Sequence, residues 1–237
     1  AAYAEALAKR GLNLALMARR ENILEDTARG LREKYRVEVI CLPADLSNYE
    51  TAKRLVGALE VPVGLLVYNA AYCPVGLFEE MTEERLARVV AVNITGPLLL
   101  AKLLSGPMIK NRRGGIVLMS SLAGMQGSPK LASYAASKAF NAILAEGLWK
   151  ELRPHGVDVI ASCAGAVLTP GYRRTQHARA PGTLAAAEVA ERTLNRLGKA
   201  PAVVPGAVNK AARFLMTRIL PRKSAIEIMS RNTGALS

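Results

Sequence analysis

Short apolar runs alternate with longer helix-like segments along most of the chain. The apolar runs, bounded by glycine, proline or polar residues, lie at 12–17, 37–42, 64–68, 114–121, 157–162 and 202–204. Helices are expected between and around them, at 1–11, 20–35, 48–60, 81–111, 132–153, 185–197 and 208–220. Runs rich in valine, isoleucine and leucine suit strands that are buried on both faces. The alternation predicts an α/β fold, a doubly wound parallel sheet with helices on both faces.

The composition fits one domain over residues 1–237. This length lies within the single-domain range for α/β folds, and 51% hydrophobic content is ample for a core. The sequence contains no internal repeat or linker. Glycine, proline or charge interrupts the longest apolar run, so none approaches the ~20 residues needed to cross a bilayer.

Disulfide, zinc and hydrolase chemistry have no matching motif. The cysteines Cys41, Cys73 and Cys163 are isolated and odd in number, without Cys-x-x-Cys, so we expect no metal site and a reducing, cytoplasmic setting. There is no Gly-x-Ser-x-Gly. His155 and His177 lie near a Pro-Gly turn and in a loop, where a solvated histidine is the simpler interpretation than a catalytic base.

The net charge of +13 indicates attraction to anions but not a particular site. Two basic groups stand out, the tail at 206–237 and a cluster of three arginines, Arg173, Arg174 and Arg179. Neither is accompanied by aromatic residues spaced for base stacking, so nucleic-acid binding is not expected.

One serine, one tyrosine and one lysine have spacings that suit removing a proton from an alcohol. Tyr134 and Lys138 are four residues apart in an alanine-rich segment, so they share one helix face. The ammonium is expected to lower the pKa of the phenol from about 10. Ser121 ends the buried run at 114–121, at the carboxyl end of a strand, where open α/β sheets bind ligands. Taken singly, each piece is more often a surface helix or a turn.

The combination resembles the short-chain dehydrogenase/reductase family, which has Tyr-x-x-x-Lys and a serine thirteen positions before the tyrosine. The resemblance covers nearly the whole chain and weakens after about Thr169. It implies that Tyr134 is the general acid/base and that Ser121 binds the substrate oxygen. It also implies that Lys138 holds the nicotinamide ribose and lowers the tyrosine pKa, and that the protein forms a homodimer or homotetramer.

Two asparagine motifs extend this resemblance. Asn93, in a pattern similar to the family's Asn-x-x-Gly, is implied to anchor the water and lysine of a proton relay; a helix residue bonded to backbone is the alternative. The family's Asn-Asn-Ala-Gly corresponds to Tyr68 followed by the cofactor-contacting residues Asn69, Ala70 and Ala71. Ala71, in place of glycine, narrows the backbone's room near the cofactor.

The resemblance places Asp45 and Leu46 at the adenine of the cofactor. The Asp45 carboxylate is implied to bind the exocyclic amine. Alternatively, Asp45 caps the following helix, although Ser47 and Asn48 compete for that position.

Arg19 and Arg20 indicate NADP(H) as the cofactor. They follow the run at 12–17, where an NAD-preferring protein would carry an acidic residue for the ribose 2′-hydroxyl. Cations at a helix start oppose the helix dipole and favour an anionic partner such as a 2′-phosphate. Pairing of these arginines with Glu21 or Glu25 is the alternative.

Further contacts are implied after the run at 157–162. Gly165, Val167 and Thr169 keep the family's places at the nicotinamide amide and phosphates, whereas Ala164 replaces a proline and loosens the turn. A substrate loop is expected at about 165–184. The candidate substrate-wall residues are largely apolar and favour a hydrophobic carbonyl or alcohol: Leu122, Met125, Tyr72, Cys73, Leu168 and Tyr172.

These features together imply an NADP(H)-dependent oxidoreductase. The alternative is a catalytically silent member of the family that binds dinucleotide as a regulator or scaffold.

The chain opens directly on the helix expected at 1–11. The family has a strand and a glycine-rich turn before this point, and the strand lies in the middle of the sheet. We therefore expect ~15–25 preceding residues in the whole protein, enough for a strand and its phosphate-binding turn. No pyrophosphate-binding glycine can be named.

The tail at 206–237 contains an amphipathic helix at 208–220, which Pro221 ends, and a second short apolar segment at 225–229. An apolar stripe is formed by Val208, Ala211, Ala212, Leu215, Met216 and Ile219. It is expected to pack on the domain or on another subunit. A sharper hypothesis is peripheral attachment to an anionic membrane surface.

Overall fold

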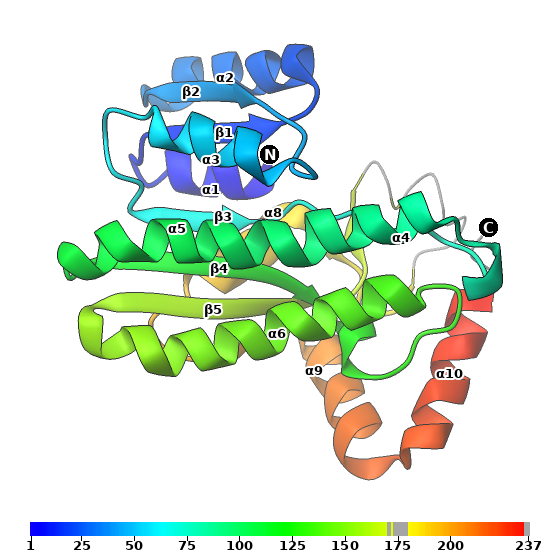
Figure 1. Cartoon of the computed structure of the whole chain (residues 1–237). Helices are drawn as coiled ribbons and strands as arrows, with labels where there is room; N and C mark the ends of the chain where they lie inside the picture. The colour runs from blue at the N-terminus through cyan, green and yellow to red at the C-terminus, as the bar shows by residue number, and fades with distance from the viewer. Residues whose placement is uncertain (170–171, 173–179, 235–237) are drawn as a thin grey trace. The chain divides into compact units, whose positions relative to one another are not determined.

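The computed structural model describes residues 1–169, 172 and 180–234 (Figure 1). Two compact units, Ala1–Pro62 and Val63–Ser237, are distinguished by their internal contacts. A single domain spanning both stays a prediction.

The first unit contains a two-stranded parallel sheet and three helices. Strand β1 (Leu14–Ala18) pairs with β2 (Val39–Pro43), with Leu14 opposite Val39 and Ala18 opposite Pro43. The helices are α1 (Ala2–Ala8), α2 (Glu21–Tyr35) and α3 (Tyr49–Gly57). In the described residues, β2 is the only strand paired with β1.

Small residues allow α1 and α2 to pack closely together and against this sheet. A hydrogen bond of 2.8 Å from Lys34 Nζ to Glu5 Oε1 also joins the two helices. Much of the buried core is alanine, whose small side chain permits close approach. The core residues are Ala4, Ala8, Ala28, Leu31, Val37 and Val39.

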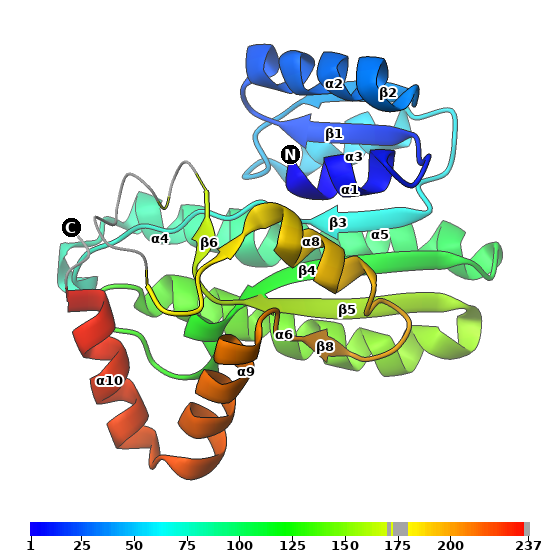
Figure 2. The ribbon, with the colours of Figure 1, turned by 180° about the vertical axis from the view of Figure 1, so that it is seen from behind.

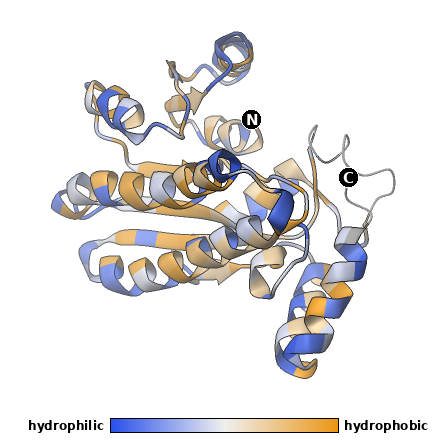
Figure 3. Cartoon of the chain, turned by 45° about the vertical axis from the view of Figure 1, so that its right-hand side comes forward, coloured by the Kyte–Doolittle hydropathy of each residue, from blue (hydrophilic) through white to orange (hydrophobic). Residues whose placement is uncertain are grey.

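The second unit is built on a four-stranded parallel sheet. Its order is β3 (Leu65–Tyr68), β4 (Gly114–Ser121), β5 (Val157–Ala164) and β8 (Ala202–Val203). The longest pairing joins β4 to β5 and ends with Ser121 opposite Ala164. Figure 3 shows mainly hydrophobic colouring along these strands, as expected for a sheet buried on both faces.

Helices lie on both faces of the four-stranded sheet (Figures 1 and 2). One face carries α5 (Gly96–Lys110) and α6 (Ala132–Leu152), and the other carries α8 (Ala186–Leu194). A short parallel pair, β6 (Val167–Leu168) and β7 (Leu184–Ala185), follows β5. This arrangement confirms the predicted fold class.

The helix predicted at 81–111 is continuous but changes its hydrogen-bonding pattern. Helix α4 (Glu83–Val90) passes through a π-helical turn, Ala91–Thr95, into α5. Together, Glu83–Lys110 forms the one helix in the described residues that is long and apolar enough to cross a membrane. The expectation that proline and glycine interrupt every such segment is wrong, because the helix continues through Gly96 and Pro97. It packs against β3, β4 and β5, and core helices meet the same criterion.

The tail forms two helices, α9 (Ala207–Phe214) and α10 (Arg222–Gly234). A π-helical turn, Leu215–Ile219, extends α9, and Pro221 separates the two helices as predicted. The second segment is longer than expected, since the apolar residues at 225–229 lie within the 13-residue α10.

Candidate active site

Ser121 lies where β4 gives way to a 3-10 turn, Leu122–Met125. It is the last residue of the strand, and its Oγ accepts a hydrogen bond of 3.2 Å from the backbone N–H of Ala123. The turn packs tightly on α6, because a Cβ at Gly124 would lie 2.6 Å from the backbone nitrogen of Ala139. Sequence reasoning missed Gly124, since nothing local signals the approach of a distant helix.

Tyr134 and Lys138 come from the first turns of α6 and meet this strand end. The Ser121 side chain hydrogen-bonds Tyr134. Lys138 Nζ lies 5.5 Å from the centroid of the Tyr134 ring and donates a 2.9 Å hydrogen bond to the carbonyl of Met119. A further bond of 2.7 Å, from Ser120 Oγ to the Lys138 carbonyl, fixes α6 against β4. The structure thus brings together the three residues that sequence spacing singled out.

The electrostatics of this cluster differ from expectation. Burial raises the pKa of Tyr134 above its ordinary value, the neighbouring Cys73 acts in the same direction, and the hydrogen bond with Ser121 opposes them. Burial also lowers the pKa of Lys138 to about 8. The prediction that Lys138 depresses the pKa of Tyr134 is therefore wrong for this structure. Desolvation of the phenolate raises the pKa of Tyr134 by more than any lowering that the Lys138 ammonium causes.

Asn93 sits in the π-helical turn and is fully buried. Its Oδ1 accepts from Tyr72 N at 2.7 Å, and its Nδ2 donates to Tyr72 O at 2.8 Å and to Ser137 Oγ at 3.0 Å. Ser137 in turn donates to the Tyr134 carbonyl at 2.7 Å. Asn93 is therefore bonded to backbone, as the alternative interpretation expects, and its part in a proton relay stays a prediction. The same contacts link the loop after β3 to the helix that carries Tyr134.

Tyr68 supports the π-helical turn at another point. Its buried hydroxyl donates a 2.6 Å hydrogen bond to the Val92 carbonyl. A Cβ at Gly96 would overlap that hydroxyl. Tyr68, which departs from the family pattern, is thus accommodated by a glycine that leaves room for it. The predicted cofactor residues Asn69, Ala70 and Ala71 directly follow Tyr68 at the end of β3.

The predicted substrate-wall residues lie in several segments of the second unit. Electrostatic interactions join Cys73 to Lys138 and Tyr134; the residue as a whole is exposed, but desolvation of its thiol raises the pKa of Cys73 to about 11. The Tyr72 ring lies 5.2 Å from the Arg88 guanidinium carbon. Leu122 and Met125 belong to the turn after Ser121, and Leu168 to β6, where it pairs with Ala185.

Tyr172 is held by neighbours in the same region. Its backbone N–H donates to Thr169 Oγ1 at 3.1 Å, and its hydroxyl lies 3.3 Å from Thr183 Oγ1. Four residues named from the sequence, Arg173, Arg174, His177 and Arg179, lie outside the described residues.

Gly165 packs against a side chain that sequence reasoning missed. A Cβ at Gly165 would lie 2.6 Å from Oδ1 of Asn209. Asn209 is buried in α9 and donates to the carbonyls of Gly182 at 3.0 Å and Pro205 at 2.9 Å. Gly165 therefore has a packing role, while Val167 lies in β6, two residues before Thr169.

The first unit carries the predicted phosphate-binding arginines. Arg19 follows β1 and Arg20 is the N-cap residue of α2, with no side-chain capping bond. The Arg19 side chain is 61% exposed, and its Nη1 lies 3.8 Å from Oδ2 of Asp45. The alternative is an ion pair of these arginines with Glu21 or Glu25, and no such pair occurs among the described ion pairs. Glu25 instead pairs with Arg32 at 3.5 Å. An exposed guanidinium beside a helix N-terminus fits a phosphate.

Asp45 does not cap the following helix. Its Oδ1 accepts from the N–H and the hydroxyl of Ser47, both at 2.9 Å. Asn48 is the N-cap residue of α3, and its side chain accepts from Thr51 N at 3.0 Å. The capping alternative for Asp45 is therefore wrong. Leu46 lies in the same turn, between Asp45 and Ser47.

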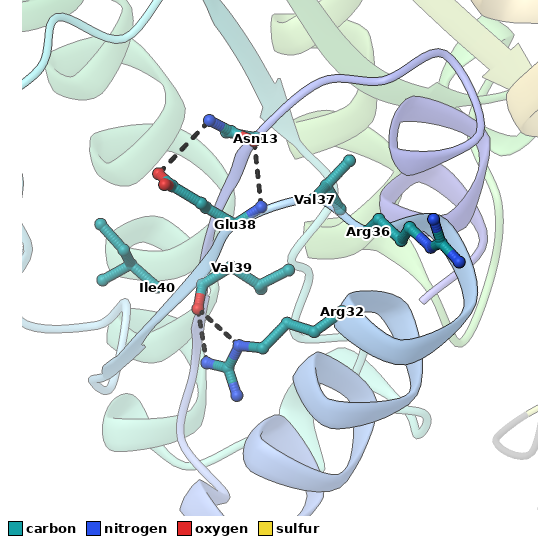
Figure 4. A pocket seen from close by; sticks show the side chains of 7 residues that line it. All are labelled: Asn13, Arg32, Arg36, Val37, Glu38, Val39 and Ile40. Atoms are coloured by element: carbon teal, nitrogen blue, oxygen red, sulfur yellow. Dashed lines mark hydrogen bonds between the residues drawn. The ribbon is translucent and has the colours of Figure 1, made fainter.

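Two hollows in the described part of the chain have linings that do not include Ser121, Tyr134 or Lys138. An open hollow of about 640 Å³ lies beside β2, and its polar groups largely satisfy one another: Asn13 bonds to Glu38, and Arg32 to the Val39 carbonyl (Figure 4). A second cavity of about 190 Å³, lined mostly by apolar residues, reaches Ser133, beside Tyr134 in the chain.

The parallel sheet, with a serine at a strand's carboxyl end and a tyrosine and a lysine on the next α-helix, is the arrangement expected for an α/β oxidoreductase of the family that the sequence resembles. The profile of the family described as short chain dehydrogenase matches residues 1–180. The chain belongs to the short-chain dehydrogenase/reductase family.

Two curated relatives illustrate the range of the family. A 7beta-hydroxysteroid dehydrogenase of Clostridium sardiniense is 31% identical over 209 residues, which cover 86% of this chain and 80% of that protein. The inactive hydroxysteroid dehydrogenase-like protein 1 of Homo sapiens is 33% identical, over 67% of this chain and 49% of that protein.

Solved structures agree with these relationships. A structure from work on 7beta-hydroxysteroid dehydrogenase stereoselectivity has a TM-score of 0.89 and 26% identity, covering 96% of this chain and 91% of the other. A short-chain dehydrogenase from Sphingobium yanoikuyae in complex with NADPH has a TM-score of 0.77 and 27% identity, covering 92% and 91%. These likenesses place the chain among oxidoreductases of alcohols and carbonyls.

Proposed function

We propose that this protein is an NADP(H)-dependent oxidoreductase that interconverts a hydrophobic carbonyl compound and its secondary alcohol. The observation that carries the proposal is the cluster of Ser121, Tyr134 and Lys138 at the junction of β4 and α6. Bound NADP(H) supplies or accepts the hydride at the carbonyl carbon. The chain's own residues bind the carbonyl oxygen and move its proton.

The raised pKa of Tyr134 suits proton donation. A phenol whose pKa lies above 10 stays protonated near neutral pH and can deliver its proton to the oxygen of a carbonyl being reduced. Ser121, which already hydrogen-bonds Tyr134, is placed by this proposal on the same substrate oxygen. Lys138, with a pKa of about 8, is mostly cationic near pH 7 and stabilises the phenolate left after transfer.

The proposed preference for NADP(H) rests on Arg19 and Arg20. The exposed Arg19 guanidinium offers two parallel N–H donors, which match a phosphate. Arg20 adds positive charge at the start of α2. Asp45, Leu46, Asn69, Ala70, Ala71, Gly165, Val167 and Thr169 are proposed as the remaining cofactor contacts.

A hydrophobic substrate is supported by side-chain chemistry and by the relatives. Leu122, Met125 and Leu168 offer apolar surface near or after the strand ends. The two curated relatives reported above have hydroxysteroid dehydrogenase names, and another similar structure, 27% identical, is of a bulky-bulky ketone specific alcohol dehydrogenase from Comamonas testosteroni. We propose steroid-like or other bulky ketones as the substrate class, and a cytoplasmic homo-oligomer as the working form.

A catalytically silent dinucleotide-binding protein is the second candidate, because one relative is named inactive. The two candidates differ in turnover, not in cofactor binding. The discriminating experiment is to follow NADPH and NADH oxidation by the full-length protein against a panel of steroid, bicyclic and aliphatic ketones. Oxidation of NADPH with a hydrophobic ketone supports the enzyme; cofactor binding without turnover on any ketone supports the silent protein.

A further inference from the structure

The tail helices leave a row of apolar side chains exposed. Val208 is 55% exposed, Phe214 61%, Leu215 46% and Ile219 60%. Of the stripe predicted from the sequence, only Ala212 and Met216 are partly buried. Packing of the whole stripe on its own domain, one of the two expected arrangements, is therefore wrong, whereas packing on another subunit stays a prediction. The π-helical turn at Leu215–Ile219 shifts the helical register at the end of this row.

Basic residues lie close to this row in the sequence. Lys210, Arg218, Arg222 and Lys223 are exposed, and Arg213 is half-buried beside them in sequence. Over residues 206–237, six basic residues and one acidic residue, Glu227, give a net charge of +5. The surface is therefore both apolar and cationic.

Specific contacts hold these helices on the rest of the second unit. Asn209 anchors α9 through the carbonyls of Gly182 and Pro205. Arg222 Nη1 donates a 2.6 Å hydrogen bond to the Met125 carbonyl, and Ala225 of α10 is completely buried. The outward face is thus presented by a supported element and not by a free end.

We propose that the exposed face of α9 and its π-helical extension binds an anionic lipid surface. Apolar side chains flanked by cations fit such a surface, because the headgroups attract the cations while the interface accepts the apolar groups. A second copy of the chain is a poorer occupant. A two-fold contact would place the same cationic surface opposite itself, where like charges repel.

The proposal goes beyond the oxidoreductase function and does not depend on turnover. It is tested by sedimentation of the full-length protein with phosphatidylglycerol vesicles and, separately, with phosphatidylcholine vesicles. We expect about tenfold or greater preference for phosphatidylglycerol at low salt, falling as salt screens the charges. Equal binding to both vesicle types, or no binding to either, would overturn the proposal.

Matched variants identify the surface. Lys210→Glu with Arg218→Glu should abolish the preference, whereas Lys110→Glu with Lys199→Glu makes a similar change in net charge at exposed sites elsewhere and should retain most of it. Phe214→Ser with Ile219→Ser should weaken binding without unfolding, as judged by circular dichroism. If this apolar variant instead turns an oligomer into a monomer and leaves lipid binding unchanged, the face is a subunit interface and the proposal is wrong.

Discussion

The β4–α6 junction and the start of α2 differ in how their candidate ligand-binding side chains are held: those at the junction are buried and bonded, and Arg19 before α2 is exposed. At the junction, Lys138 and Asn93 are buried and bonded, and burial displaces the pKa values of Tyr134 and Lys138. At the start of α2, the Arg19 side chain is mostly exposed and has only a loose ion pair with Asp45. Proton transfer needs fixed geometry and a tuned pKa, whereas phosphate binding needs accessible donors. The comparison predicts that substitutions at the junction cause large losses of turnover. Substitutions of the arginines should cause smaller losses of affinity, confined to one of the two cofactors.

The largest expected effect comes from Tyr134→Phe. Removing the hydroxyl eliminates the proposed proton donor while keeping the ring, so turnover should fall by at least about 10²-fold. NADPH binding, followed by fluorescence titration, should be nearly unchanged. Turnover close to that of the wild type would remove Tyr134 from the mechanism.

Arg19→Ala should weaken NADPH binding by about 1.5 to 3 kcal/mol, or roughly 10- to 150-fold, the range for a hydrogen bond to a charged group. NADH binding should change little. Arg29→Ala removes an exposed arginine of α2, the helix that follows Arg19, where Arg29 is paired with Asp26; it is the matched control and should leave both affinities unchanged. Equal losses for NADPH and NADH with Arg19→Ala would show that the residue is structural.

Gly96→Ala tests the close approach of Tyr68 to the π-helical turn. The added methyl would overlap the Tyr68 hydroxyl, so unfolding free energy should fall by about 1 to 3 kcal/mol, as for overpacked cores. Gly106→Ala is the control in the same helix, because its Cβ would meet nothing within 4 Å. That variant should be neutral or more stable by up to about 1 kcal/mol in denaturant titration. Similar changes in the two variants would contradict the packing described for Gly96.

A pH dependence of stability caused by Lys138 is also expected. Its pKa is about 8 in the folded protein and 10.5 as the ordinary value, so between these limits the unfolded chain binds more protons. Stability should therefore rise with pH between about 8 and 10 relative to a Lys138→Met variant. Well below pH 8, Lys138 is protonated in both the folded and the unfolded protein. The difference in stability between the wild type and the variant should therefore stop changing with pH there. A wild-type curve parallel to that of the variant throughout would show that burial does not shift this pKa.

The sequence predicted the elements that depend on local pattern. The strands β3, β4 and β5 were recognisable from apolar runs between glycine and polar residues, and α6 from its alanine-rich composition. Ser121, Tyr134 and Lys138 were recognisable from their spacing, and the structure brings them together. Arg19 and Arg20 were recognisable as candidate ligands of a 2′-phosphate. They follow β1, where an NAD-preferring protein would carry an acidic residue instead.

Features that depend on distant contacts were not predictable. The raised pKa of Tyr134 comes from burial among segments far apart in the chain. The roles of Gly124 and Asn209 depend on the backbone that packs beside them. The π-helical turn at Ala91–Thr95 also gave no signal, because a single extra residue per turn barely alters hydrophobic periodicity.

Transfer of deuterium tests the central claim most directly. NADPH carrying deuterium at both positions of nicotinamide C4 would be incubated with full-length protein and the best hydrophobic ketone from the panel, and the product analysed by mass spectrometry. The account predicts one deuterium on the carbinol carbon of the product alcohol, with strongly reduced transfer by Tyr134→Phe. Alcohol formed without deuterium, or no alcohol from any ketone despite bound NADPH, would contradict it.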